Sequence, residues 1–184
     1  MLSAAEAKKI LHEAEQVCSE QDAAEAVRRI AGEVTLALSD AHPLVLSVMG
    51  GAVIFTGQLL PMLRFPLDFD YVHVTRYNNT TQGGELSWIV SPRLSVKGRT
   101  VLILDDVLDA GITLAAIKKR MLEDGAQACY TAVFAEKNLG HEKPITADFT
   151  GVHLPNRYVF GFGMDVQGAW RNLPAVYAVK AGGE

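Results

Sequence analysis

The sequence predicts an α/β fold in which a central, mostly parallel sheet is flanked by helices. Short apolar runs rich in Val, Ile and Leu recur along the chain, and such runs are typical of strands buried in a parallel sheet. Segments with helical periodicity lie between several of these runs, and strand–helix–strand alternation implies right-handed parallel crossovers. The length of 184 residues favours a single domain with a sizeable core.

Two helices are predicted within the first forty residues. Ser3-Ala-Ala-Glu6 has the pattern of a capping box, and Asp22-Ala-Ala-Glu25 resembles one in which Asp22 is the cap. Each pattern opens an Ala-rich amphipathic stretch. A turn is expected at 40–43, because Asp, His and Pro interrupt the apolar pattern there.

The remaining elements follow from apolar periodicity and from breaks rich in Gly, Pro and Asn. We expect helices at 52–63 and 114–123, and strands at 44–48, 68–75, 86–90, 101–106, 130–135, 148–153, 157–162 and near 176. Residues 76–85 are polar and rich in Gly and Asn, which is typical of a long loop.

Composition limits the class of protein. The net charge of −4 and the pI of about 5.7 argue against a large nucleic-acid surface, which needs a basic face. The N-terminus lacks a signal pattern, and no apolar stretch is long enough to span a bilayer. Cys18 and Cys129 have neither metal-ligand nor CxxC spacing, so we interpret them as reduced structural thiols of a cytoplasmic protein.

The end of the 101–106 strand carries the strongest functional signal. Asp105 and Asp106 directly follow an apolar run, at the edge where open α/β sheets hold their ligands. Burying unpaired acids is costly, so a cation or a proton must compensate. Gly111 frees the backbone and Thr113 opens a helix, whose N–H groups suit an anion. The pattern indicates a metal-bound, phosphorylated sugar or nucleotide.

A solvated turn is the alternative interpretation of these acids, because Asp is common in turns. It is weakened because Asp105 and Asp106 continue a buried strand. Adjacent residues of a strand point to opposite faces. One carboxylate is therefore free to face a ligand while the other meets the backbone or a neighbouring side chain.

The run 101–114 resembles the phosphoribosyl-pyrophosphate (PRPP) binding motif of the type I phosphoribosyltransferases: an apolar strand, two acids, two apolar residues, then Asp-(Thr/Ser/Ala)-Gly-x-Thr. Residues 48–60 are similar to a pyrophosphate loop and its following helix, and 68–77 to the strand that leads to a flexible catalytic loop. Residues 158–174 are similar to a purine-binding C-terminal segment. From about Leu44 onward, the chain resembles the hypoxanthine-guanine phosphoribosyltransferase family.

This resemblance implies the type I phosphoribosyltransferase fold, in which terminal segments form a small hood. The N-terminal helices would lie at 1–40, the core at 41–155 and the base-binding hood segment at 156–184. It implies Mg²⁺-dependent transfer of the 5-phosphoribosyl group from PRPP to hypoxanthine or guanine, giving IMP or GMP plus pyrophosphate. The implied assembly is a homodimer or homotetramer, with no nucleic-acid or membrane partner.

The resemblance also implies the residues that hold PRPP. Ribose and the 5′-phosphate would be bound by Asp105, Asp106, Asp109, Ala110, Gly111, Ile112 and Thr113, and pyrophosphate by Met49, Gly50, Gly51 and Arg171. Three positions depart from the usual family pattern. Asp105 stands where Glu is usual, Ala110 where Thr or Ser is frequent, and Met49 where many members have Lys, so no side-chain charge serves pyrophosphate at that last position.

Residues for the base and the metal follow in the same way. Asp109 matches the general acid/base at purine N7, and Lys137 the donor to the 6-oxygen. Tyr158 would stack on the base and Val159 would offer backbone groups to its edge. Asp165, with Asp105 and Asp106, would bind the metal directly or through ribose or water. Arg76 and Tyr77 begin the flexible loop, where the family usually has Ser-Tyr.

Structural roles are the alternatives for most of these residues. The alternative for Lys137 is an exposed strand-end lysine, for Tyr158 a core aromatic and for Arg171 a surface ion pair, and the matching segments favour the functional roles. His73 and Trp88 are interpreted as packing residues. At the level of the whole chain, the alternatives are a xanthine-preferring transferase and a non-catalytic PRPP-binding regulator. A regulator need not keep Lys137 and Tyr158 together with the acid of the C-terminal segment, so their joint presence favours the enzyme.

Overall fold

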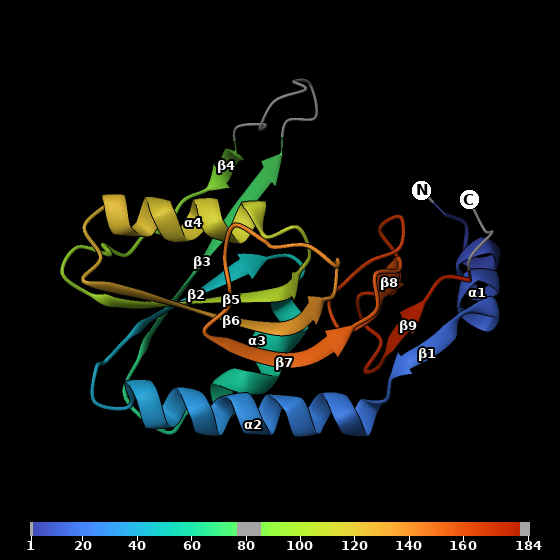
Figure 1. Ribbon diagram of the computed structural model, residues 1–184, viewed down its shortest axis with the longest axis horizontal. Coiled ribbons are helices and arrows are strands. Elements are labelled where there is room, and N and C mark those ends of the chain that lie inside the picture. The colour runs from blue at the N-terminus through green and yellow to red at the C-terminus, as the bar shows by residue number, and fades with distance from the viewer. Residues whose placement is uncertain (1, 77–85, 181–184) are drawn as a thin grey trace.

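The computed structural model describes residues 2–76 and 86–180 and contains two sheets (Figure 1). The larger has the strand order β4-β3-β2-β5-β6-β7 and the smaller the order β1-β9-β8. The helical elements are α1 (Ala4–Glu13), α2 (Glu20–Leu38), α3 (Val53–Leu59), the 3₁₀ turn η1 (Leu60–Met62) and α4 (Ile112–Glu123). The strands are β1 (Glu15–Cys18), β2 (Leu44–Met49), β3 (Asp68–Arg76), β4 (Leu86–Val90), β5 (Thr100–Leu108), β6 (Ala128–Lys137), β7 (Phe149–Leu154), β8 (Val159–Phe160) and β9 (Val176–Ala178).

The larger sheet lies between α4 on one face and α2 with α3 on the other (Figure 1). Only the β3–β4 pair is antiparallel, so the predicted mostly parallel sheet flanked by helices is confirmed. Within β5, Leu102 and Leu104 pack on the α2 face, whereas Val101 and Ile103 pack on the α4 face. Both faces of the strand are buried, which explains why its sequence is continuously apolar.

The start of α2 differs from the sequence prediction. Ser19, and not Asp22, is the N-cap, because the Ser19 hydroxyl accepts a hydrogen bond from the Asp22 amide at 3.1 Å. The Asp22 carboxylate in turn accepts from the Ser19 amide at 3.3 Å. An acid three residues after a serine thus forms the capping box, with Asp in place of the more usual Glu. At α1, the capping box predicted for Ser3 and Glu6 is confirmed.

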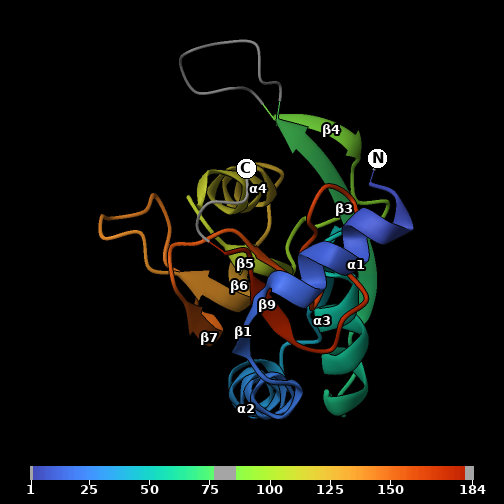
Figure 2. The ribbon, with the colours of Figure 1, turned by 90° about the vertical axis from the view of Figure 1, so that its right-hand side faces the viewer.

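The smaller sheet, together with the segment between β8 and β9, forms the hood. The sheet joins both ends of the described chain (Figure 2). Its strand β1 lies between the two N-terminal helices and was not predicted, because four residues are too short for a clear alternation. The Trp170 indole donates to the Ala7 carbonyl at 2.7 Å, which ties the C-terminal segment to α1. The expected hood of terminal segments is therefore present.

Several other elements have bounds that differ from prediction. The strand expected at 157–162 is limited to β8, because Gly161 and Phe162 adopt positive φ values of 96° and 52° and turn the chain. The helix expected at 52–63 is α3 followed by η1, which has Pro61 in its first turn. The acidic strand β5 continues beyond Asp106 to Leu108. Among the described residues, no helix has the length and apolarity needed to cross a membrane.

Candidate active site

A pocket of about 330 Å³ opens at the carboxyl ends of β2, β3 and β5. This is the edge at which parallel sheets place ligand sites. It gathers ten of the residues that were predicted to hold PRPP, namely Met49, Gly50, Gly51, Asp105, Asp106, Asp109, Ala110, Gly111, Thr113 and Arg171. Ile112, also predicted for the phosphate loop, is exposed and does not line the pocket.

Asp105, which is buried, and Asp106, which is half-buried, form an acidic pair that lines this pocket. The Asp105 carboxylate accepts from the Asp106 amide at 3.0 Å, and the Asp106 carboxylate from the Val107 amide at 2.9 Å. Burial and the neighbouring Asp106 charge raise the pKa of Asp105 well above its usual range. Burial also raises the pKa of Asp106, although hydrogen bonds and Arg171 partly offset the effect. The ligand-free pair therefore binds a proton more readily than isolated carboxyl groups do, and a bound cation would offset the same charge.

Replacing Asp105 by Asn is expected to stabilise the ligand-free, metal-free protein at neutral pH. Its raised pKa means that the folded chain binds this proton more tightly than the unfolded chain does. The resulting stability is complete below the unfolded pKa of about 4 and is lost as pH rises through the folded pKa. Urea unfolding should show a more stable Asn variant at neutral pH and a difference that vanishes below about pH 4. A less stable variant at neutral pH would contradict this account.

Two glycines bring the hood against the pocket. A Cβ built on Gly51 would overlap the Asp106 carboxylate, and one built on Gly163 would overlap the Gly51 carbonyl oxygen. Gly163 also has a φ of 101°, which only glycine adopts readily. The loop after β2, whose Met49–Gly50 peptide bond is cis, is thus in direct contact with both the acidic pair and the hood.

Arg171 links the pocket to the hood residues that were predicted to bind the base. Its guanidinium donates to the Gly163 carbonyl at 2.6 Å and pairs with Asp165 at 2.5 Å. The Tyr158 hydroxyl donates to the Asp165 carbonyl at 3.3 Å, while the Tyr158 ring is exposed and the neighbouring Val159 is buried. Among the described residues, no three His, Cys, Asp or Glu side chains are grouped so that they could hold a metal ion.

Asp109 and Lys137 meet across the ends of β5 and β6. The Lys137 ammonium lies 3.2 Å from the Asp109 carboxylate. The Lys137 side chain is 13% exposed, whereas that of Asp109 is 51% exposed. Lys137 also lines a second cavity, of about 550 Å³, that adjoins the first through this ion pair. The structure thus brings the predicted acid/base and the predicted donor to the base into contact.

Sequence reasoning misplaced or missed two residues near the site. His73, interpreted as a packing residue, lines the pocket because the parallel register puts it beside Met49. Lys143, which no motif singled out, lies with Lys137 in the second cavity. The signal that could have placed His73 at the site is the parallel pairing of its strand with the strand that ends at Met49. The side chain of Arg76 and the whole of Tyr77 lie outside the described residues.

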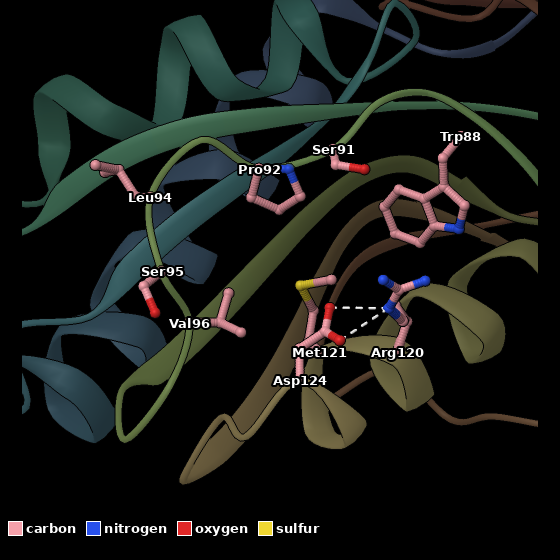
Figure 3. A pocket seen from close by; sticks show the side chains of 9 residues that line it. All are labelled: Trp88, Ser91, Pro92, Leu94, Ser95, Val96, Arg120, Met121 and Asp124. Atoms are coloured by element: carbon pink, nitrogen blue, oxygen red, sulfur yellow. Dashed lines mark hydrogen bonds and ion pairs between the residues drawn. The ribbon is translucent and has the colours of Figure 1, made fainter.

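A third pocket, of about 280 Å³, lies between α4 and the segment after β4 (Figure 3). None of the predicted site residues that the structure describes lines it. Arg120 donates to both carboxylate oxygens of Asp124 at 2.9 Å and stands 5.9 Å from the centre of the Trp88 ring. Trp88 therefore packs against the helix, as its sequence context predicted.

Comparison with known proteins agrees with this geometry. The sequence model of the phosphoribosyl transferase domain matches residues 13–167. The hypoxanthine-guanine phosphoribosyltransferase of Bacillus subtilis (strain 168) is 32% identical over 171 residues, which are 92% of this chain and 95% of the relative. The hypoxanthine-guanine-xanthine phosphoribosyltransferase of Tritrichomonas foetus is 28% identical over 163 residues, covering 88% of this chain and 89% of the relative.

Solved structures with a similar fold include hypoxanthine phosphoribosyltransferases. The crystal structure of a hypoxanthine phosphoribosyltransferase from Staphylococcus aureus superposes with a TM-score of 0.86 at 22% identity, covering 94% of this chain and 95% of the other. The chain belongs to the hypoxanthine-guanine phosphoribosyltransferase family of the type I phosphoribosyltransferases.

Proposed function

We propose that the protein is a purine salvage enzyme that transfers the 5-phosphoribosyl group of PRPP to hypoxanthine or guanine, giving IMP or GMP and pyrophosphate. The observation that carries this proposal is the contact between Asp109 and Lys137 beside the acidic pocket. This contact supports the proposal, because the carboxylate would accept a proton and the ammonium would donate a hydrogen bond at the edge where the ribose of PRPP would lie. The activity named for the Bacillus subtilis relative supports the same substrates.

The chemistry requires a bond from purine N9 to C1 of ribose and the loss of pyrophosphate from the same carbon. We propose that Asp109 accepts the proton that purine N7 releases as this bond forms. Positive charge develops on the ribose in an oxocarbenium-like transition state. The carboxylates of Asp105 and Asp106, which line the pocket, would stabilise that charge.

Lys137 and the hood would determine which base is bound. An ammonium group donates hydrogen bonds and accepts none, so Lys137 favours the 6-oxygen of hypoxanthine or guanine over the 6-amino group of adenine. Tyr158 presents an exposed ring on which a purine can stack. Val159 would meet the base edge through its backbone, because its side chain is buried in the hood.

The anionic groups of PRPP would be bound at two places. Gly111, with a φ of 77°, is the N-cap of α4 and has no side chain in the way of the helix N-terminus. The 5′-phosphate would lie there, against Ala110, Gly111 and Thr113. Pyrophosphate would lie against Gly50, Gly51 and the fork of Arg171, while Met49 adds no charge.

Mg²⁺ is proposed to bind together with the substrate, because carboxylate oxygens are present although no three acids form a ready-made metal site among the described residues. Asp105, Asp106 and Asp165 offer carboxylate oxygens, and Mg²⁺ usually takes one or two of these together with substrate phosphates. The raised pKa values of the acidic pair indicate a site that gains from a cation. When bound, Mg²⁺ would neutralise charge on pyrophosphate. The domain division, a cytoplasmic location and a homodimeric or homotetrameric assembly are proposed from the family alone.

A pyrophosphate-release assay with PRPP, Mg²⁺ and one of four bases tests the proposal. We expect turnover with hypoxanthine or guanine and rates at least about 10²-fold lower with adenine, whose amino group leaves Lys137 without an acceptor. Turnover with xanthine alone would favour the xanthine-preferring alternative. If the protein binds PRPP but turns over none of the four bases, the result would favour the non-catalytic regulator over the enzyme.

A further inference from the structure

The segment between β6 and β7 contains a lysine whose burial is unusual. The Lys143 side chain is only 8% exposed, although lysine is almost never buried without partners. Its ammonium donates to the Leu108 carbonyl at 3.0 Å, to the Glu136 carboxylate at 3.0 Å and to the Lys137 carbonyl at 2.6 Å. An ammonium has three N–H donors, so these contacts satisfy it completely.

Two of these three acceptors lie next to the proposed reacting groups. The Leu108 carbonyl immediately precedes Asp109, and the Lys137 carbonyl belongs to the residue that pairs with Asp109. Lys143 therefore connects the end of β5 to the end of β6, at the last paired residues of the two strands, Leu108 and Glu136, and at the next residue, Lys137. The separation between these two strand ends determines where the Asp109 carboxylate and the Lys137 ammonium lie.

The residues that follow Lys143 support the same loop from another side. A Cβ built on Gly111 would lie 3.2 Å from Ile145 and 3.4 Å from Pro144. Ile145 also packs in the core beneath α4. Residues 143–145 thus form a brace, in which Lys143 binds the end of β5 through a hydrogen bond while Pro144 and Ile145 lie close to the Gly111 turn.

We infer that Lys143 is a positioning residue for the transfer reaction, and that it fixes the distance between Asp109 and Lys137 through the two backbone carbonyls. This inference rests on the proposed function. Lys143 itself does not line the acidic pocket, so it acts through its neighbours and not on PRPP. The Glu136 carboxylate has a different part, because it balances the charge of the buried ammonium.

The test compares Lys143→Met with Lys118→Met. Methionine keeps most of the apolar stem and removes the three donors. Lys118 is a matched control, because its ammonium also pairs with an acid, Asp148, at 3.1 Å. The Asp148 carboxylate accepts a hydrogen bond from the Thr131 amide of β6, and neither residue contacts Asp109 or Lys137 through a hydrogen bond or ion pair described above. We expect Lys143→Met to lower kcat/KM for hypoxanthine on the order of 10- to 100-fold, as displaced reacting groups do. The dissociation constant for PRPP, measured by calorimetry, should change less than about threefold in both variants, because the phosphate loop keeps its amides.

Two results would overturn the inference. One is an equal fall in kcat/KM for Lys143→Met and Lys118→Met, which would indicate a general loss of stability. The other is a loss of turnover in Glu136→Gln that matches Lys143→Met, which would assign the effect to charge and not to the carbonyl contacts. Glu136→Gln keeps a hydrogen-bond acceptor and is expected to lose stability while turnover changes less than about threefold.

A measurement that needs no turnover separates this inference from the proposed function. Heteronuclear NMR of the lysine NH₃⁺ groups reports the ion pair of Lys137 with Asp109, with Lys137→Met and Asp109→Asn providing the assignments. In Lys143→Met, the Lys137 signal should move toward its position in Asp109→Asn, while the Lys118 signal stays in place. An unmoved Lys137 signal would overturn the positioning role, even if no purine is a substrate.

Discussion

Replacing Asp109 by Asn is expected to leave PRPP binding intact and to lower kcat for hypoxanthine by about 10²–10⁴, the range for a positioned acid/base. The amide has nearly the same size as the carboxylate, but it cannot accept a proton from purine N7. The Asp109 side chain is half exposed, and the amide oxygen of Asn still offers an acceptor to the Lys137 ammonium, which is only 13% exposed and loses its charged partner. The loss should therefore fall on the chemical step and not on folding.

Asp124→Asn supplies the control for this variant. Asp124 pairs with Arg120 at the far end of α4, so its replacement also removes one surface ion pair. Single-turnover kinetics with saturating PRPP and hypoxanthine measures the chemical step, and calorimetry with PRPP and Mg²⁺ measures binding. Turnover that is unchanged in Asp109→Asn, or reduced equally in Asp124→Asn, would remove Asp109 from the catalytic role.

The parts of the site that were predictable from sequence are those encoded in one contiguous segment. Residues 105–113 combine a strand end, a glycine turn and a helix start, and each has a local signature that needs no knowledge of distant contacts. The burial of Asp105 follows from the same run, because the residue continues the α4-facing row of Val101 and Ile103.

The parts that were not predictable depend on contacts between distant segments. Strand β1 is a strand only because β9, some 160 residues later, pairs with it. Lys143 is buried only because the ends of β5 and β6 present carbonyl groups to it. The pairing of Asp109 with Lys137 needs the β5–β6 register, and before the fold was known only the family resemblance suggested their common site. Local patterns hold none of this information.

Replacing Gly163 by Ala is expected to disrupt the site from the hood side. The φ of 101° alone makes an L-residue unfavourable there, by about 1–3 kcal/mol. A steric clash adds to this backbone strain, because the new Cβ would overlap the Gly51 carbonyl oxygen. That oxygen belongs to the backbone and cannot rotate away as a side chain would. The loop after β2 must therefore move, and Asp106, which packs against Gly51, must move with it.

Gly168→Ala separates these two effects. Gly168 has a similar φ of 88°, but a Cβ built on it meets no atom within 4 Å. Both variants should lose free energy of unfolding, since both place an L-residue at positive φ. Only Gly163→Ala should also lower kcat/KM for PRPP, on the order of 10²-fold, because only there do the pyrophosphate loop and the acidic pair shift. If kcat/KM for PRPP falls equally in both variants, strain and not contact governs the effect. The hood would then influence the site through its own stability, and the close approach of Gly163 to Gly51 would have no separate role in catalysis.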